Sequence, residues 1–100
     1  MSLSIKVNSD TGVVCISILG SFDFSLFHEF REAYAEFIGK KDRFTIDLSG
    51  VEYLDSAALG MLLSMKSALG ENSVIELKGA NDFIKNILMI SRFDKRFEIR

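Results

Sequence analysis

The sequence predicts an α/β fold with a mixed, mostly parallel β-sheet and helices, in one domain that spans residues 1–100. Apolar and polar residues alternate in several short runs, which is typical of strands. Most of these runs are separated by segments with helical periodicity, which favours parallel pairing. The first two runs follow one another directly. The expected order is therefore β-β-α-β-α-β-α-β, with an antiparallel pair at one edge of the sheet.

The N-terminal part of the chain predicts two strands and a helix. Residues 3–7 and 13–19 alternate in strand fashion, and the short polar loop between them favours a hairpin. A helix is expected after the loop that contains Asp23, and its apolar stripe continues to about Ile38. Gly39 marks its end, because glycine commonly terminates helices.

The middle of the chain predicts the central strand and a second helix. Residues 44–48 alternate as a strand, and Ser49-Gly50 is a turn signal. The helical pattern then begins at Ser56 and ends near Leu69, with Gly70 as its stop.

The C-terminal part predicts one more strand, a third helix and a short closing strand. The strand covers residues 73–78, and a turn at 79–82 leads into the helix at 83–90. After a break at 92–95, Phe97 and Ile99 alternate in the closing strand.

The second helix carries two candidate stripes. The expected inner stripe consists of Leu59, Leu62, Leu63, the stem of Lys66 and Leu69, with Ala58 and Met65 alongside. A second stripe has small or flexible residues where a solvated face would carry charges: Ala57, Gly60, Met61, Ser64 and Ala68. It predicts either close packing against a neighbouring strand or a flat docking surface with Met61 as an adaptable contact.

The composition excludes several classes of partner. A net charge of −2 argues against nucleic acid, which demands a basic face. No apolar run approaches the roughly 18 residues of a membrane span. The single cysteine, Cys15, cannot form an internal disulfide, which fits a reducing compartment. We therefore expect a cytoplasmic protein that binds neither nucleic acid nor membrane.

The sequence holds no recognisable catalytic motif. Clusters of metal-ligating residues and glycine-rich phosphate loops are missing, so neither a metal nor a cofactor is expected. The only histidine, His28, lies on another helix from Ser56, which argues against a Ser-His pair. Asp47 could suggest a phospho-accepting aspartate, but a structural role in which it bonds its own backbone fits better. We expect that the protein is not an enzyme.

Ser56 stands where the second helix begins. Either Asp55 or Ser56 can cap that helix, because a side-chain oxygen there accepts from a free backbone N–H. A hydroxyl beside unpaired amides at the positive end of a helix is also a good place to hold a phosphate. A plain helix cap and a phosphate site both remain open at this point.

Two segments resemble the STAS domain, the fold of bacterial anti-sigma factor antagonists. The family's D-S-[SAT]-[GA]-[LIV]-G string corresponds to Asp55–Gly60, after the strand and loop that contain Asp47–Val51. A glycine followed three positions later by aspartate, before the first helix, corresponds to Gly20–Asp23. Ala58 departs from the glycine of many members, and Ala57 removes a second hydroxyl that some relatives have.

The resemblance implies a phosphorylation switch. Ser56 would be phosphorylated by an anti-sigma factor that is also a serine kinase of the histidine-kinase-like ATPase type. A PP2C-like phosphatase would reverse the modification, and Asp23 would help to present the site. The output need not be a sigma factor, since similar free-standing domains also serve biofilm and secretion switches.

Two hypotheses about function follow. In the first, the unmodified protein docks on its partner, and phosphate on Ser56 releases it by charge and desolvation. The docking surface would consist of Asp23, Asp55, Ser56, Ala57, Gly60, Met61 and Ser64. In the alternative, the domain is a passive module of a non-sigma pathway, which binds a nucleotide or a partner without covalent switching.

Overall fold

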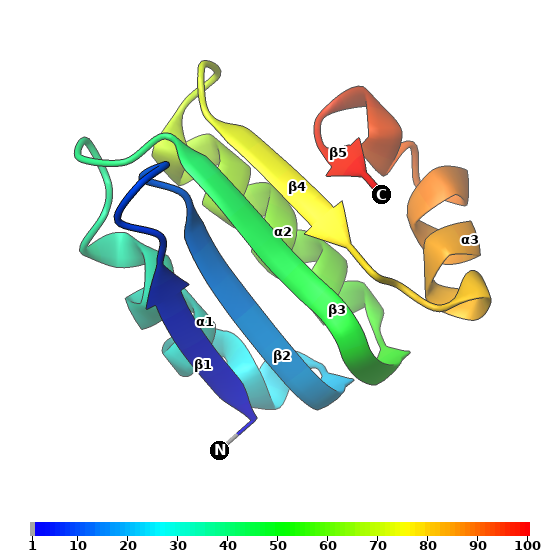
Figure 1. The fold of residues 1–100 in the computed structure, drawn as a ribbon. Helices are drawn as coiled ribbons and strands as arrows, with labels where there is room; N and C mark the ends of the chain where they lie inside the picture. The colour runs from blue at the N-terminus through cyan, green and yellow to red at the C-terminus, as the bar shows by residue number, and fades with distance from the viewer. Residues whose placement is uncertain (1) are drawn as a thin grey trace.

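The computed structural model describes residues 2–100, and its elements follow the predicted order (Figure 1). Two short 3-10 turns, η1 and η2, supplement the helices. The bounds are β1 Leu3–Val7, β2 Val14–Phe22, η1 Phe24–Leu26, α1 Phe27–Ala35, β3 Arg43–Leu54, α2 Ser56–Leu69, β4 Val74–Lys78, α3 Asp82–Ile90, η2 Phe93–Lys95 and β5 Glu98–Ile99.

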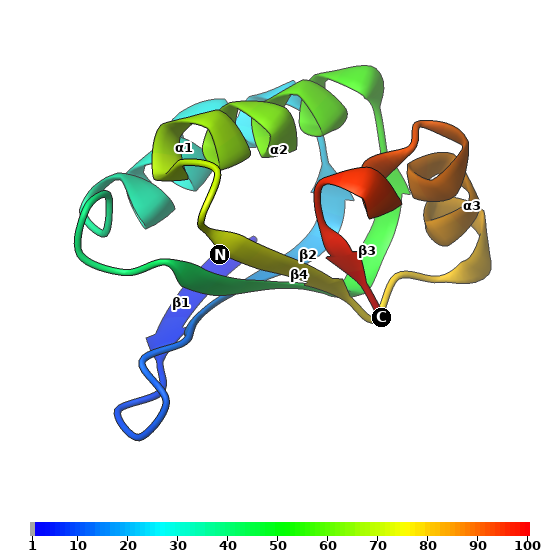
Figure 2. The same ribbon diagram turned by 90° about the horizontal axis from the view of Figure 1, so that it is seen from above.

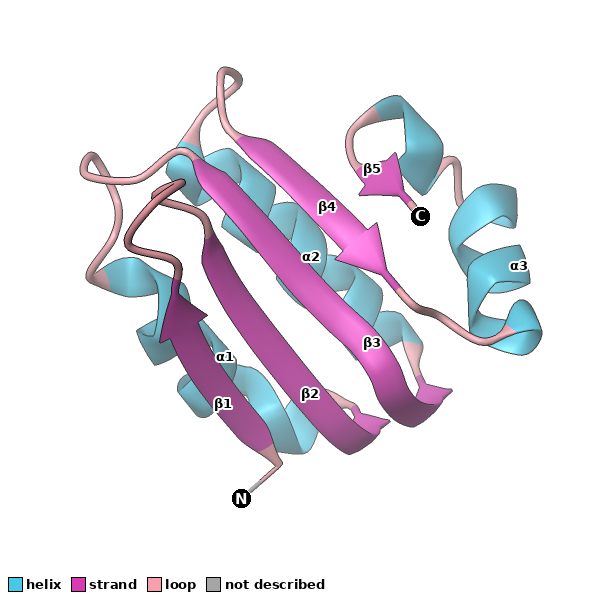
Figure 3. Ribbon diagram, viewed as in Figure 1, coloured by secondary structure: helices cyan, strands magenta, loops and turns pink. Residues whose placement is uncertain are grey.

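The strands form one sheet in the order β1-β2-β3-β4-β5 (Figure 3). β1 pairs with β2 in antiparallel fashion, and the other neighbours pair in parallel. This arrangement confirms the predicted mixed, mostly parallel sheet with its antiparallel edge. Each parallel connection returns through a helix, which is what such connections require.

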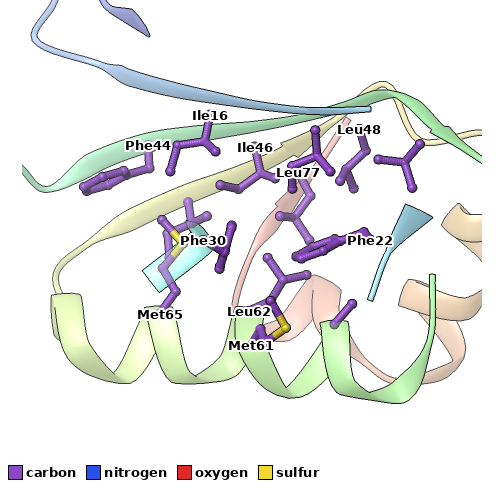
Figure 4. Close-up of a cluster of buried hydrophobic side chains, with 14 of the residues drawn as sticks. Ile16, Phe22, Phe30, Phe44, Ile46, Leu48, Met61, Leu62, Met65 and Leu77 are labelled. Carbon is purple, nitrogen blue, oxygen red and sulfur yellow. The ribbon is translucent and has the colours of Figure 1, made fainter. Parts of the chain in front are cut away.

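The core lies between the sheet and the helices. Figure 2 shows α1 and α2 together on one face of the sheet. The side chains that the central strands place on that face are buried, and most of them are aromatic rings or branched aliphatic chains. Figure 4 labels ten core residues from the strands and the helices: Ile16, Phe22, Phe30, Phe44, Ile46, Leu48, Met61, Leu62, Met65 and Leu77.

The opposite face of the sheet is polar. Thr45 lies between Cys15 and Glu76 in the register, and its hydroxyl donates to Glu76 Oε1 at 3.2 Å. Glu76 also forms an ion pair with Arg100, whose Nε lies 3.0 Å from Glu76 Oε2. Alternation of apolar and polar residues along each strand therefore separates a buried, apolar face of the sheet from a polar face that contacts solvent. Within residues 2–100, no helix combines the length and apolarity needed to span a bilayer.

The predicted turn at Ser49-Gly50 is wrong, because β3 continues through it to Leu54. The register between β2 and β3 shifts after Ser17, and Leu19 becomes the partner of Gly50. A Cβ at Gly50 would collide with the side chain of Leu19. Leu19 is exposed and its terminal methyl group can move aside, so this contact favours a glycine at the bulge without requiring one. Gly50 therefore lies in a bulged strand and not in a turn.

The first helix is shorter than predicted. It is preceded by η1 and ends at Ala35, and residues 36–40, which include Gly39, form turns that lead into the loop before β3. Gly39 adopts a φ of +77°, which favours glycine, so it contributes to the turn rather than directly ending the helix.

Asp47 accepts hydrogen bonds from a residue two positions further along the chain, as its predicted structural role requires. Its Oδ1 accepts from the backbone N of Ser49 at 3.0 Å and from the Ser49 hydroxyl at 2.7 Å. The hydroxyl bond, then the backbone bond, lowers the pKa of the Asp47 carboxyl, because both stabilise the ionised form. Asp47 is therefore a stabilised anion on the polar face.

Candidate functional site

The candidate site lies where the carboxyl ends of β2 and β3 meet. Phe22 and Leu54, the last residues of these strands, are paired in the register. Asp23 and Asp55 come next in sequence, so two neighbouring strand ends each lead into a polar cap. Adjacent strands lie about 4.8 Å apart, and the structure thus brings the Asp23 loop and the Ser56 helix together.

Asp55, not Ser56, is the cap of α2. Its carboxylate accepts from the backbone N of Ala58 at 3.0 Å, and its backbone is extended with φ −113°. Ser56 is the first residue inside the helix, and it is exposed. The interpretation of Ser56 as a plain helix cap is therefore wrong, and its hydroxyl lies at the surface beside the positive end of α2.

Replacing Asp55 is expected to destabilise the protein, because the first turn of α2 would lose its cap. Asp55→Ala should lower the free energy of unfolding by about 0.5–2 kcal/mol, measured by urea denaturation. Ser56→Ala, the matched control one residue along, should have an effect below about 0.5 kcal/mol, as is usual at exposed positions. Equal losses in the two variants would contradict the assignment of the cap.

Asp23 caps the neighbouring loop in the same manner. Its Oδ1 accepts from the backbone N of Ser25 at 2.9 Å and also from the Ser25 hydroxyl. The carbonyl of Asp23 accepts from Leu26 N at 3.1 Å, which closes the 3-10 turn η1. These bonds stabilise the conformation of the loop itself, and Asp23 is partly exposed.

The outer face of α2 carries no charge. Its exposed residues are Ser56, Gly60, Leu63, Ser64, Ser67 and Ala68. The only charged residue of the helix, Lys66, is buried, and its ammonium donates to the carbonyl oxygens of Glu71 and Ser73. Charged residues usually cover the outer face of a surface helix, so this face is unusual.

Gly60 is open to solvent. An added Cβ would meet no atom within 4 Å, so close packing against a neighbouring strand does not explain the glycine. Gly60 and Ser64 lie on the exposed face, as the docking hypothesis expects, and Ala57 is half-buried. The helix thus presents a smooth strip that extends from Ser56 along its length.

The predicted assignment of α2 residues to the buried and exposed faces of the helix is partly wrong. Met61 is only 5% exposed and packs into the core, as Figure 4 shows, so it does not belong to the outer face. Leu63, predicted for the inner stripe, is 37% exposed instead. The buried face centres on Ala58, Leu62 and Met65, which recur at the helical period. Lys66 is buried as predicted.

Two exposed aromatic residues adjoin the site, and sequence reasoning missed both. Phe24 follows Asp23 directly and is 67% exposed, and Tyr53 precedes Asp55 by two residues and is 51% exposed. The bulges in β3 break strict alternation, so Glu52 and Tyr53 are both exposed. Large rings beside polar caps are the one signal that could have found them, because aromatic residues are enriched at binding surfaces.

The chain matches known proteins over nearly its whole length. The family model described as "Mlab, STAS domain" matches residues 5–100. A STAS-domain containing protein of Pseudomonas aeruginosa (strain UCBPP-PA14) is 38% identical over 100 residues, which cover 99% of each chain.

Solved structures share the fold. An anti-sigma factor antagonist from Mycobacterium paratuberculosis superposes with a TM-score of 0.80 at 23% identity, over 98% of this chain and 85% of that one. The Bacillus cell fate determinant SpoIIAA in its phosphorylated form gives a TM-score of 0.76 at 14% identity, over 98% and 90%. The unphosphorylated form of SpoIIAA gives 0.77 at 14% identity, over 98% and 86%.

The two kinds of match agree. The family model covers residues 5–100, and the Pseudomonas protein aligns from end to end. The five-stranded sheet has the same fold as the solved anti-sigma factor antagonists. This chain therefore belongs to the STAS-domain family.

Proposed function

We propose that the protein is a phosphorylation-switched regulator and not an enzyme. In its unmodified form it binds and sequesters an anti-sigma factor that is also a serine kinase, and phosphorylation of Ser56 releases that partner. The observation that supports this proposal best is the exposed Ser56 at the start of a helix whose outer face is uncharged. SpoIIAA, which has this fold, has been solved with and without its phosphate.

The geometry of Ser56 supports both halves of the switch. Ser56 is exposed at the carboxyl ends of the strands, where a kinase can reach it. A phosphate there would carry about −1.5 to −2 charges. The helix N-terminus would return only about 0.3–1 kcal/mol to an exposed anion. Asp55 precedes the phosphate in sequence, and Asp23 lies at the neighbouring strand end, so both carboxylates would repel it.

The docking surface that we propose starts at Ser56 and continues along α2. It includes the Asp23 loop, Asp55, Ala57, Gly60 and Ser64, and we add the exposed rings of Phe24 and Tyr53. The α2 part of this surface is uncharged, so a partner that covers it has little desolvation to overcome there until a phosphate is added. Met61 supports this surface from the core.

The enzymes that act on Ser56 follow from the family resemblance. We propose a kinase of the histidine-kinase-like ATPase type and a PP2C-like phosphatase, both acting in the cytoplasm. Neither enzyme needs to unfold the site, since Ser56 is already at the surface.

The alternative function, non-covalent ligand binding at Ser56, has less support from the surface. One hollow, of about 590 Å³, is lined by residues of β1 and α1, and another, of about 270 Å³, lies on the polar face of the sheet. Ser56 lines neither of them. A drug-sized or nucleotide-sized ligand needs a concave site, whereas a protein partner suits a smooth helix face.

The intact mass of the protein purified from its native cells should distinguish the two functions. We expect a fraction that is heavier by one phosphoryl group, located on Ser56 by fragmentation, and no such fraction for Ser56→Ala. Ser64 and Ser67, also exposed on α2, act as internal controls. An unmodified chain that copurifies with a small molecule would contradict the switch and support the module.

A further inference from the structure

The edge of the sheet opposite β5 has an unusual combination of features. β1 pairs only with β2 and forms that edge (Figure 1). Ile5 and Val7 are 43% and 41% exposed, although their register partners Ile16 and Val14 are buried on the helix-covered face. The layer of helices therefore covers Leu3 at the start of the edge strand but leaves Ile5 and Val7 partly uncovered.

The free backbone groups of β1 belong to the same residues as these exposed side chains. Leu19 N donates to Ser2 O at 2.8 Å, and Asn8 N donates to Val13 O at 2.9 Å. Bonded and non-bonded pairs alternate in an antiparallel ladder, so the even-numbered residues of β1 bond to β2. The N–H and C=O groups of Leu3, Ile5 and Val7 point outwards, away from β2.

A groove adjoins this edge. It has a volume of about 590 Å³ and lies between β1 and α1, with Leu3, Ile5 and Ala33 as its apolar lining. Glu29 and Glu32 line it from α1, and both are exposed. Glu36, four residues after Glu32, continues the acidic row along the same side of the helix.

Within residues 2–100, no salt bridge neutralises the acidic row. The salt bridges found within residues 2–100 involve Glu71, Glu76 and Glu98, all outside α1. Arg31 lies on the opposite side of α1, where it lines a small cleft towards α2. The groove therefore combines an apolar floor, an unpaired strand edge and a negative rim.

We propose that this edge binds an extended segment of a partner protein as an added strand, and that the segment alternates apolar and basic side chains on the face towards α1. Backbone bonds to Leu3, Ile5 and Val7 supply the register, as in other cases of strand addition. Apolar side chains cover Ile5 and the groove floor, and a lysine or arginine pairs with Glu29 and Glu32.

A second copy of this chain fits the edge less well. Pairing of β1 with its own copy about a two-fold axis is possible for the backbone, because such a contact is self-complementary. It would, however, bring the two acidic rows of α1 towards one another across the joined sheet. Like charges that face each other are destabilising, so the rim selects a basic partner over a copy.

The test uses a synthetic probe peptide. The capped peptide is long enough to span β1 and has threonine at every second position. Isoleucine and arginine alternate at the positions between, so these two residue types share one face of the strand. The matched control replaces each arginine by glutamate. We expect the arginine peptide to bind the full chain at least about tenfold more tightly than its control, measured by fluorescence anisotropy at low salt.

Two variants locate the binding to the edge. Ile5→Pro removes an outward N–H that β2 does not use, and proline is tolerated on such edges. Glu29→Lys combined with Glu32→Lys reverses the rim at exposed positions of α1, and it keeps the test valid if proline disturbs folding. Each should weaken binding of the arginine peptide by about tenfold or more, whereas Ser56→Asp should leave it unchanged.

Three outcomes would overturn the proposal. They are equal binding of the two peptides, no binding of the arginine peptide, and a concentration-dependent dimer of the chain that Ile5→Pro abolishes. The last outcome would assign the edge to a second copy. Because the readout does not depend on Ser56, its result stands whether or not the phosphorylation switch exists.

Discussion

Phosphorylation of Ser56, or the substitution Ser56→Asp, is expected to weaken binding of the kinase partner by about a hundredfold or more. The physical reason is that the partner would have to bury a charge that the uncharged face of α2 cannot neutralise. Burial of an unpaired charge costs several kcal/mol, and each 1.4 kcal/mol is tenfold in affinity. Ser56→Ala should bind as tightly as the wild-type chain, measured by calorimetry.

A charge at the far end of the same helix face is the matched control. Ser67 is exposed and lies about three turns after Ser56, roughly 16 Å along the axis. Ser67→Asp adds the same charge as Ser56→Asp, and we expect it to weaken binding less. Circular dichroism should be unchanged in all three variants, since both positions are exposed. Equal affinity of Ser56→Ala and Ser56→Asp would contradict the charge mechanism.

Leu62→Ala is expected to reduce the free energy of unfolding by about 2–5 kcal/mol. Leu62 is fully buried between α2 and the sheet, so truncation leaves a cavity in the core (Figure 4). A domain of this size has a total stability of about 5–15 kcal/mol, and the loss should be obvious in urea denaturation. No other single substitution discussed for this helix should cost as much.

Leu63→Ala is the control for Leu62→Ala, because it makes the same chemical change one residue away. Leu63 is 37% exposed, so part of its surface is already in water and the expected loss is about 1 kcal/mol or less. The ratio of the two losses measures the rotation of α2 about its axis. Comparable losses would show that the helix is turned from the orientation described above.

The sequence could predict the order of elements because each element carries its own local signal. Strand alternation and helical periodicity are properties of neighbouring residues, and they predict the order of the elements and the antiparallel first pair. The bounds of α2 were also predictable, since Asp55 supplies a cap and Gly70, with φ +97°, supplies a stop.

Features that depend on contacts between strands could not be predicted. Gly50 was interpreted as a turn residue, because nothing local distinguishes a turn glycine from one that admits a neighbouring side chain. The contact with Leu19, 31 residues earlier in the chain, arises through a shift in strand register. The bulge that exposes Tyr53 also arises from a shift in register between β2 and β3, so local sequence patterns do not predict it.

The candidate site likewise has features that the local sequence predicts and a feature that it does not. The position of Ser56 at the start of a helix is a local property and was predictable, as was the nearby loop of Asp23. The rotation of α2 was not, because almost every residue of this helix is apolar or small and several stripes fit the pattern. Met61 was therefore placed on the docking surface, although it belongs to the core.

Hydrogen bonds at both termini of α2 limit how far the helix can move when Ser56 is modified. The Asp55 carboxylate holds its first turn, and the ammonium of Lys66 ties its last turns to the chain that enters β4. These bonds oppose sliding or rotation of the helix when a group is attached to its first turn. We therefore expect a protein that detects the state of Ser56 to contact the first turn of α2 directly.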